Sequence, residues 1–207
     1  MNEPMKITAI VGTYRKGGAI DSAVDEILDA AREEGAEATK IYLIDKHIEF
    51  CTNCRTCTQQ EGASRGQCPI DDDMGDILDA IERSDAVVLA SPMNFSTVTA
   101  VTKRFIERLV CFAYWPWGTN IPKIRNPRKT KRAVVVTSSA APSLLARLTT
   151  RLVGLLKSGA GLLGAKTVGV LFVGLAAGES QPDIGAHARR KARRLGRKLA
   201  VRNTPPA

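Results

Sequence analysis

The sequence has 207 residues, of which 44% are hydrophobic and 25% are charged, and its formal net charge is +9 at pH 7. This length and composition predict one globular domain, residues 1–207, and exclude a disordered chain. The longest apolar run, Val168 to Ala177, is about half the ~18 residues that a membrane span needs, and the N-terminus has no signal-peptide pattern. We therefore expect a cytoplasmic protein with no membrane partner.

Positive charge is concentrated in two segments, Lys123 to Arg132 and His187 to Arg202. In the second segment, Leu195 and Leu199 mark an apolar stripe, which predicts that the basic residues lie on a solvated face. Both segments lack the interleaved aromatic residues that single-strand binding proteins stack on bases, so we do not expect nucleic acid as a partner. Attraction of an anionic small molecule is the better explanation of this charge.

Hydrophobic periodicity and turn residues predict the elements in chain order. They are a strand at Lys6–Gly12, a helix at Ile20–Glu34, a strand at Ala38–Ile44, a helix from Asp72 or Asp73 to Arg83, a strand at Ala86–Ala90, a helix at Thr99–Phe112, a strand at Lys131–Ser138, a helix at Leu144–Leu156, a strand at Thr167–Val173 and a helix at Asp183–Val201, with a frayed tail at Asn203–Ala207. Five strands that alternate with five helices predict an α/β fold with a doubly wound, five-stranded parallel sheet.

Two long segments have no periodicity and carry chemically distinctive side chains. Residues Asp45–Asp72 hold four of the five cysteines, and irregular excursions of this length usually carry function. Residues 113–130 hold both tryptophans together with prolines at 116 and 122, which predicts a lid or an interface loop without regular elements. Because Trp and Tyr anchor subunit interfaces, this second segment predicts a homodimer or tetramer. A lid packed within its own chain is the alternative.

Ligands of doubly wound sheets bind beyond the carboxyl ends of the strands, which here singles out the loops Gly12–Ile20, Ser91–Thr97 and Thr137–Ser143. The first loop joins a strand to a helix N-terminus, where free backbone amides and the helix dipole attract a phosphate. It is not a nucleotide-triphosphate loop, because Gly18 and Ala19 stand where Lys and Ser or Thr are required. It is not a G-x-G-x-x-G dinucleotide fingerprint either.

Four motifs follow one another along the chain: Gly12-Thr-Tyr-Arg-Lys-Gly-Gly, Cys51-x-x-Cys54-x-x-Cys57 with Cys68, Asp72-Asp73-Met74 and Ser91-Pro92-Met93-Asn94-Phe95. In this order they make residues 5 to 175 resemble the NADPH-dependent FMN reductases, in particular the branch that includes the iron–sulfur flavoproteins. The resemblance implies a flavodoxin-like fold, bound FMN rather than FAD, and NAD(P)H as a substrate. It also gives the net positive charge a role in attracting NADPH.

The resemblance also implies which residues bind the cofactor. Thr13 and Arg15 would contact the FMN phosphate, and the backbone amides from Gly17 to Ile20 would complete its cradle. The full set is Thr13, Arg15, Gly17, Gly18, Ala19, Ile20, Pro92, Met93, Asn94, Phe95, Ser138 and Ser139. Three of these depart from the family, which has Asn and Thr at the positions of Ala19 and Ile20, and Tyr at that of Asn94. Each lost hydrogen bond to a charged group costs ~1.5–3 kcal/mol, so weak FMN binding is expected.

We expect no catalytic side chain, because hydride acceptance belongs to the flavin itself. The implied activity is that of an FMN-dependent NAD(P)H oxidoreductase, which passes electrons to a quinone, a flavin, a metal or another small-molecule acceptor, or to a redox protein. A non-enzymatic electron carrier or redox sensor that acts on a protein partner is the alternative.

The spacing of Cys51, Cys54 and Cys57 predicts metal or redox chemistry rather than a disulfide framework in a cytoplasmic protein. Three thiolates at this spacing can converge on one cluster, and Cys68 can supply the fourth ligand that a [4Fe–4S] cube requires. The gap between Cys57 and Cys68 is longer than the compact motif of iron–sulfur flavoproteins. Free thiols, an adventitious disulfide and a tetrahedral zinc site are the alternatives.

Overall fold

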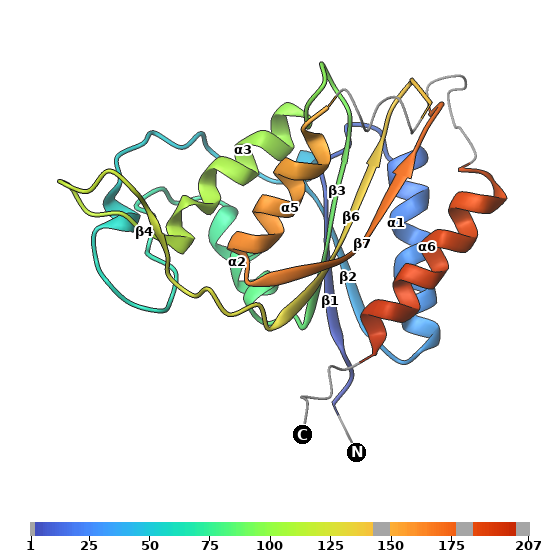
Figure 1. The fold of residues 1–207 in the computed structure, drawn as a ribbon, viewed down its shortest axis with the longest axis horizontal. Helices are drawn as coiled ribbons and strands as arrows, with labels where there is room; N and C mark the ends of the chain where they lie inside the picture. The colour runs from blue at the N-terminus through green and yellow to red at the C-terminus, as the bar shows by residue number, and fades with distance from the viewer. Residues whose placement is uncertain (1–2, 143–149, 177–183, 202–207) are drawn as a thin grey trace.

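The computed structural model describes residues 3–142, 150–176 and 184–201. Five parallel strands form one sheet in the order β2-β1-β3-β6-β7 (Figure 1). The strands are β1 (Lys6–Val11), β2 (Glu37–Tyr42), β3 (Ala86–Pro92), β6 (Lys131–Ser138) and β7 (Ala165–Val173). This arrangement confirms the predicted doubly wound, flavodoxin-like sheet. The strand order reverses between β1 and β3, so a crevice for a ligand is expected at their carboxyl ends.

Helices cover both faces of the sheet. They are α1 (Ala19–Glu33), α2 (Met74–Glu82), α3 (Ala100–Arg108), α5 (Leu152–Leu162) and α6 (Gly185–Ala200). Figure 1 shows α1 and α6 side by side on one face and α2, α3 and α5 on the other. Alternate residues of each strand feed the two cores: Ala9 and Val11 pack toward α1 and α6, whereas Ile10 packs toward α2 and α3. Burial on both faces explains why the central strands β1, β3 and β6 are rich in apolar residues.

Several element ends differ from the sequence-based prediction, and three of them show the effect of neighbouring structure. The second strand ends at Tyr42, because Leu43–Asp45 form a 3₁₀ turn, η1, that buries Leu43. The α-helix that starts after Thr99 ends at Arg108, and Leu109–Phe112 continue it as a 3₁₀ turn, η3. Helix α5 continues to Leu162, beyond the predicted end at Leu156, since burial of its small residues against α3 and the sheet outweighs their low helix propensity.

Some predictions fall partly outside the described residues. The helix predicted at 144–156 begins there, and its residues from Leu152 onward belong to α5. The predicted start of the last helix at residue 183, the tail from residue 203 and the end of the third loop at residue 143 also lie outside the described residues.

The start of α2 is organised differently from a simple Asp cap. Asp73 occupies the N-cap position without a side-chain cap hydrogen bond, and its carboxylate instead accepts the backbone N–H of His47 at 2.8 Å. The neighbouring Asp72 accepts the N–H of Met74 at 3.0 Å. The two carboxylates therefore join the start of α2 to the long segment that precedes it.

Residues 113–130, which we call the tryptophan segment, contain a regular element, so the prediction of a wholly irregular loop was wrong. Strands β4 (Ala113–Tyr114) and β5 (Lys123–Ile124) pair antiparallel as a short ribbon. The segment packs on the cysteine segment, residues 45–72: the N–H of Trp115 donates to the Thr58 carbonyl at 2.9 Å, and the N–H of Trp117 donates to the Gln59 side chain at 3.0 Å. Hydrogen bonds therefore join the tryptophan segment to the cysteine segment.

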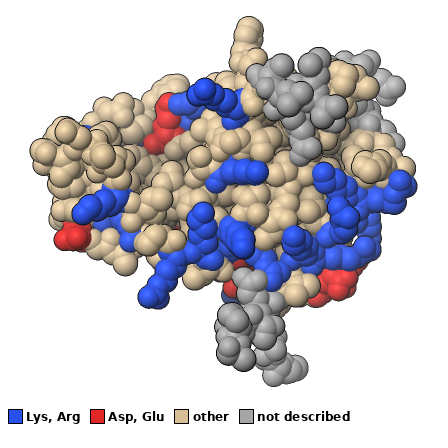
Figure 2. Space-filling view, viewed as in Figure 1, with Lys and Arg blue, Asp and Glu red and all other residues tan. Residues whose placement is uncertain are grey.

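Lys and Arg side chains gather along the side of the molecule where α6 lies (Figure 2). Part of this charge is neutralised, because Arg193 of α6 pairs with Glu26 and Glu33 of α1. His187, Arg190, Lys191 and Arg194 line an open hollow of about 230 Å³ on the outer side. Among the described residues, no helix is both long and apolar enough to cross a membrane.

Candidate functional site

A pocket of about 380 Å³ opens at the carboxyl ends of β1, β3 and β6, where the strand order reverses. We call it the strand-end pocket. It is lined by Thr13, Tyr14, Arg15, Gly18, Ala19, Ile20, Pro92, Met93, Asn94, Ser138, Ser139, Ala140 and Ala176. The lining comes from all three loops that the sequence singled out. Its volume lies within the ~300–1,000 Å³ range of small-molecule and cofactor sites.

The first loop presents backbone donors to this pocket. Gly18 occupies the N-cap of α1 without a side-chain cap, and the first amides of a helix have no acceptor within the helix. The N–H of Gly17, by contrast, donates to the Asp21 carboxylate at 2.6 Å. Gly17 therefore shapes the loop, whereas the start of α1 supplies N–H groups and a positive dipole end for an anion.

Asp21 is held in its charged form despite its burial. Burial alone would raise its pKa, but hydrogen bonds from the Gly17 amide, Lys40 and Tyr42 outweigh that effect and lower the pKa below 3.8. Lys40 lies 2.7 Å from the Asp21 carboxylate. Asp21 fixes the loop through the Gly17 amide. Because Lys40 offsets its negative charge, Asp21 repels an anion at the start of α1 less than an unpaired carboxylate would.

Arg15 supplies a positive charge at the lining of the strand-end pocket. Its backbone is fixed to Thr13, whose hydroxyl accepts the Arg15 N–H at 3.2 Å. Its side chain lies over Gly18, where a Cβ atom would come within 3.2 Å of the Arg15 Nε. Within the described residues no carboxylate pairs with this guanidinium, so it is available to bind a phosphate in a bidentate manner.

The loops after β3 and β6 are joined at the rim of the pocket. The N–H of Met93 donates to the Ser138 carbonyl at 2.8 Å, and Asn94 and Thr97 bond to each other across a tight turn. Phe95 and Ser96 occupy that turn with positive φ angles of 46° and 62°. This geometry carries the Phe95 side chain out to full exposure, away from the pocket lining.

The structure brings most of the predicted cofactor residues together. All of them line the strand-end pocket except Gly17, whose amide is used by Asp21, and Phe95, which is exposed at the turn. Sequence reasoning missed Tyr14, Ala140 and Ala176. Tyr14 precedes Arg15 in the candidate phosphate-binding loop, and its hydroxyl accepts the N–H of Ala100 at 3.1 Å. Only its place in that loop could have indicated it.

The predicted cysteine ligands also converge. Cys51, Cys54, Cys57 and Cys68 line one small cavity of about 30 Å³, which we call the cysteine cavity. Cys57 is buried and Cys54 is exposed, so the cavity lies between the protein interior and solvent. The lining also includes Arg55 and Arg108.

The thiols of the cysteine cavity influence one another. Burial raises the pKa of Cys57, and the proximity of Cys68, Cys51 and Cys54 raises it further. Hydrogen bonds from Thr56 lower the pKa of Cys54. The buried fifth cysteine, Cys111, has its pKa raised to about 12, chiefly by burial, and it does not line the cavity.

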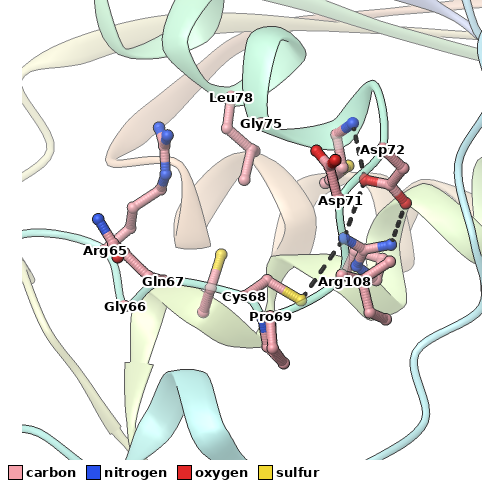
Figure 3. A pocket seen from close by; sticks show the side chains of 13 residues that line it. Arg65, Gly66, Gln67, Cys68, Pro69, Asp71, Asp72, Gly75, Leu78 and Arg108 are labelled. Atoms are coloured by element: carbon pink, nitrogen blue, oxygen red, sulfur yellow. Dashed lines mark hydrogen bonds and ion pairs between the residues drawn. The ribbon is translucent and has the colours of Figure 1, made fainter.

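Arg108 joins the cysteine cavity to a second pocket of about 300 Å³, drawn in Figure 3. Its guanidinium donates to the Asp72 carboxylate at 2.6 Å and 3.1 Å and to the Cys68 sulfur at 3.5 Å (Figure 3). Both side chains of the ion pair are almost fully buried. Cys68 therefore lies between the two spaces, with its sulfur fixed by a cation.

The charges around the cysteine cavity suit a negatively charged group. Four cysteines match the ligand number of a [4Fe–4S] cube, and the Nε atoms of Arg55 and Arg108 are buried polar atoms without a hydrogen-bond partner in the described part of the chain. Among the described residues, no three His, Cys, Asp or Glu side chains are arranged to hold a single metal ion. A cube binds each cysteine through a different iron, so its four ligands need not meet at one point.

The strand-end pocket and the cysteine cavity are separate within one chain. They share no lining residue. Helix α3 runs between them, with Ala100 at its start bonded to Tyr14 and Arg108 at its end in contact with Cys68. Its nine residues correspond to about 13 Å of helix. A short rigid element therefore connects the two candidate cofactor sites.

Residues 5–179 match the family of NADPH-dependent FMN reductases, and the chain belongs to this family. Among curated proteins, it is 37% identical over 112 residues to an iron–sulfur flavoprotein of Archaeoglobus fulgidus, covering 54% of this chain and 49% of that protein. It is 30% identical over 106 residues to the iron–sulfur flavoprotein of Methanosarcina thermophila, covering 51% and 53%. The chain thus spans about half the length of the curated relatives it matches.

Solved structures share the fold at lower sequence identity. The NAD(P)H:quinone oxidoreductase from Methanothermobacter marburgensis aligns with a TM-score of 0.68 and 19% identity, over 99% of this chain and 100% of that one. An FMN-dependent NADH-azoreductase of Bacillus anthracis, solved with FMN, aligns with a TM-score of 0.69 and 11% identity, over 95% and 100%. At this level of identity the likeness shows the flavodoxin-like fold alone.

Proposed function

We propose that this protein is an FMN-dependent NAD(P)H oxidoreductase that passes electrons to a small-molecule acceptor through a [4Fe–4S] cluster on Cys51, Cys54, Cys57 and Cys68. The observation that carries the proposal is the strand-end pocket. There the start of α1, which has no side-chain cap, and Arg15, which pairs with no carboxylate among the described residues, meet the loops after β3 and β6. Family membership supports FMN as the cofactor and NAD(P)H as the reductant.

The chain's own residues would bind and orient the cofactor. The FMN phosphate would be held by Arg15, Thr13 and the first amides of α1. The rest of the FMN would lie against Pro92 to Asn94 and Ser138 to Ser139. A bound FMN would supply the chemistry of hydride acceptance from NAD(P)H, and the residues named above would hold it in place for that reaction. No side chain is assigned as an acid, base or nucleophile.

The cluster part of the proposal rests on the cysteine cavity. Four cysteines line it, two cationic side chains face the same space, and the relatives carry the name iron–sulfur flavoprotein. Anaerobic purification and reconstitution, followed by iron, zinc and acid-labile sulfide analysis, tests it. About four irons and four sulfides per chain would support the cube. Zinc alone, or negligible metal, would leave a flavin enzyme with a different or purely structural cysteine site.

The oxidoreductase activity has a direct test. Protein loaded with FMN should oxidise NADPH or NADH steadily when a quinone, free flavin or ferric chelate is added. Flavin that is reduced once without steady turnover would favour the second candidate, an electron carrier or redox sensor for a protein partner. The exposed Cys54 beside the cavity favours that candidate, because it gives a partner a short route to the site.

Assembly and location complete the proposal. We place this protein in the cytoplasm as a homodimer or tetramer, with the tryptophan segment at the interface. Trp117 and Ile121 support the proposed assembly, since both are large apolar side chains that remain mostly exposed in the single chain.

A further inference from the structure

Arg55 lies in the middle of the cysteine motif and is clamped between two aromatic rings. Its guanidinium carbon lies 4.0 Å from the centre of the Trp115 ring and 4.2 Å from the centre of the Trp117 ring. The same guanidinium donates hydrogen bonds to the carbonyls of Trp115 at 2.5 Å and Pro116 at 3.0 Å. Rings and carbonyls together hold this cation in one place beside the cysteine cavity.

Among residues 3–142, 150–176 and 184–201, no carboxylate neutralises the positive charge of Arg55. In the described part of the chain its partners are rings and neutral carbonyls, and none of the ion pairs involves it. Arg108, the other cation at the cavity, is paired with Asp72 through two hydrogen bonds. Arg55 therefore contributes most of the net positive charge at this cavity, and its partial burial strengthens its field compared with that of a charge in water.

The backbone of Arg55 is also held in an unfavourable conformation. Its φ angle of 60° lies in the left-handed region, as does that of Asn53 at 56°. This conformation is unfavourable for a residue that has a Cβ atom. Residues held in this way concentrate at functional sites, where the surroundings enforce the geometry. The clamp therefore holds Arg55 at the lining of the cysteine cavity at an energetic cost.

We propose that Arg55 is a charge-setting residue of the cysteine site, whose clamped guanidinium stabilises the reduced form of the cluster. The inference rests on the cluster part of the proposed function. Adding one electron makes the cluster and its four thiolates more negative, and a fixed cation favours that more negative state. Removing the charge should therefore shift the reduction potential to a more negative value without changing the cysteine ligands.

The test compares full-length variants reconstituted anaerobically, with the cluster potential measured in a redox titration followed by its own spectroscopic signal. Arg55→Gln removes the charge, and Arg55→Lys retains it. Arg104→Gln is the matched control, because Arg104 also stacks on an aromatic ring, that of Phe50 at 5.0 Å, but does not line the cysteine cavity. Trp117→Ala loosens the clamp at a ring that is already 65% exposed, so its fold should be retained.

We expect Arg55→Gln to keep the iron and sulfide content of the wild type and to shift the potential to a more negative value. Arg55→Lys should recover most of that shift, Trp117→Ala should give a smaller shift in the same direction, and Arg104→Gln should give none. An unchanged potential in both Arg55→Gln and Trp117→Ala, or an equal shift in Arg104→Gln, would overturn the inference alone. A wild-type protein without iron would overturn the cluster assignment and the inference with it.

Discussion

Gly66 packs directly against the carbonyl group of Cys57. A Cβ atom at Gly66 would lie 1.7 Å from the Cys57 oxygen, and the Gly66 N–H donates to the Cys111 carbonyl at 2.8 Å. Arg125 bonds the same group of carbonyls, those of Cys57, Gly62 and Cys111, at 3.0 to 3.2 Å. The chain between Cys57 and Cys68 thus returns close to its own start, which explains how a long gap still brings the fourth cysteine to the cavity.

Gly66→Ala should disrupt the cysteine cavity, because the added methyl group overlaps backbone that cannot move freely. We expect loss of most of the iron after reconstitution and a destabilisation of about 1–3 kcal/mol in urea unfolding. Gly75→Ala is the control, since a Cβ atom at Gly75 in α2 meets nothing within 4 Å. It should leave the iron content unchanged. Normal iron loading of Gly66→Ala would show that the cysteine segment closes in another way.

Arg15→Ala should weaken FMN binding by about tenfold or more, which corresponds to the ~1.5–3 kcal/mol of a charge-assisted hydrogen bond. A fluorescence titration of flavin-free protein measures this affinity. Lys16→Ala is a matched control, because Lys16 is adjacent in the loop but pairs with Asp45 and does not line the strand-end pocket. An FMN affinity that is the same in Arg15→Ala and wild type would exclude Arg15 from the phosphate site.

Asp72→Asn should make the free energy of unfolding vary less with pH in the acidic range. Burial would raise the pKa of Asp72, but hydrogen bonds from Arg108 and from the amides of Glu49 and Met74 outweigh it and lower the pKa below 3.8. A carboxyl group with a lowered pKa stabilises the fold above its unfolded pKa, and this contribution is lost as the pH falls through its folded pKa. Removing one partner of a buried pair costs about 3–5 kcal/mol at neutral pH.

Urea unfolding of the wild type and Asp72→Asn from pH 7 down to pH 2.5 measures this effect. The difference in unfolding free energy should be largest at pH 7 and should shrink below about pH 4. Asp45→Asn, which removes a solvent-exposed pair with Lys16, should change stability by less than about 1 kcal/mol at every pH. A difference that does not vary with pH would mean that the Asp72 carboxylate has the same pKa in the folded and unfolded states.

The fold could be predicted from sequence because its signals are local and repeated. Continuous apolar strands such as Ala86–Ala90 and amphipathic helices such as Ile20–Glu34 determine a parallel, doubly wound sheet almost by themselves. Boundaries were harder, since they depend on tertiary contacts. Helix α5 continues past Leu156 because Gly159 and Ala160 are buried in the core, which neither residue type indicates on its own.

The site could be predicted in part for the same reason. Residues close together in one loop, such as Thr13 and Arg15, form a motif that can be recognised in the sequence. The sheet topology then brings the three loops together. Arg55 could not be identified in this way, because its role depends on Trp115 and Trp117, about 60 residues further along the chain. The sequence placed these tryptophans at an interface, whereas the structure shows that both rings already contact Arg55.

The exposed part of the tryptophan segment gives a last prediction, about assembly. Trp117 is 65% exposed and Ile121 is 78% exposed, even though one face of the Trp117 ring stacks on Arg55. Covering both side chains with a second copy would remove apolar surface from water at about 25 cal/mol per Å². Light scattering at micromolar concentration should therefore give a mass of at least twice 22.3 kDa for the wild type. Ile121→Ser should lower that mass, whereas Ile44→Ser, which changes an exposed isoleucine outside the segment, should not. A wild-type mass near 22.3 kDa would instead show that the segment serves its own chain by packing on the cysteine segment.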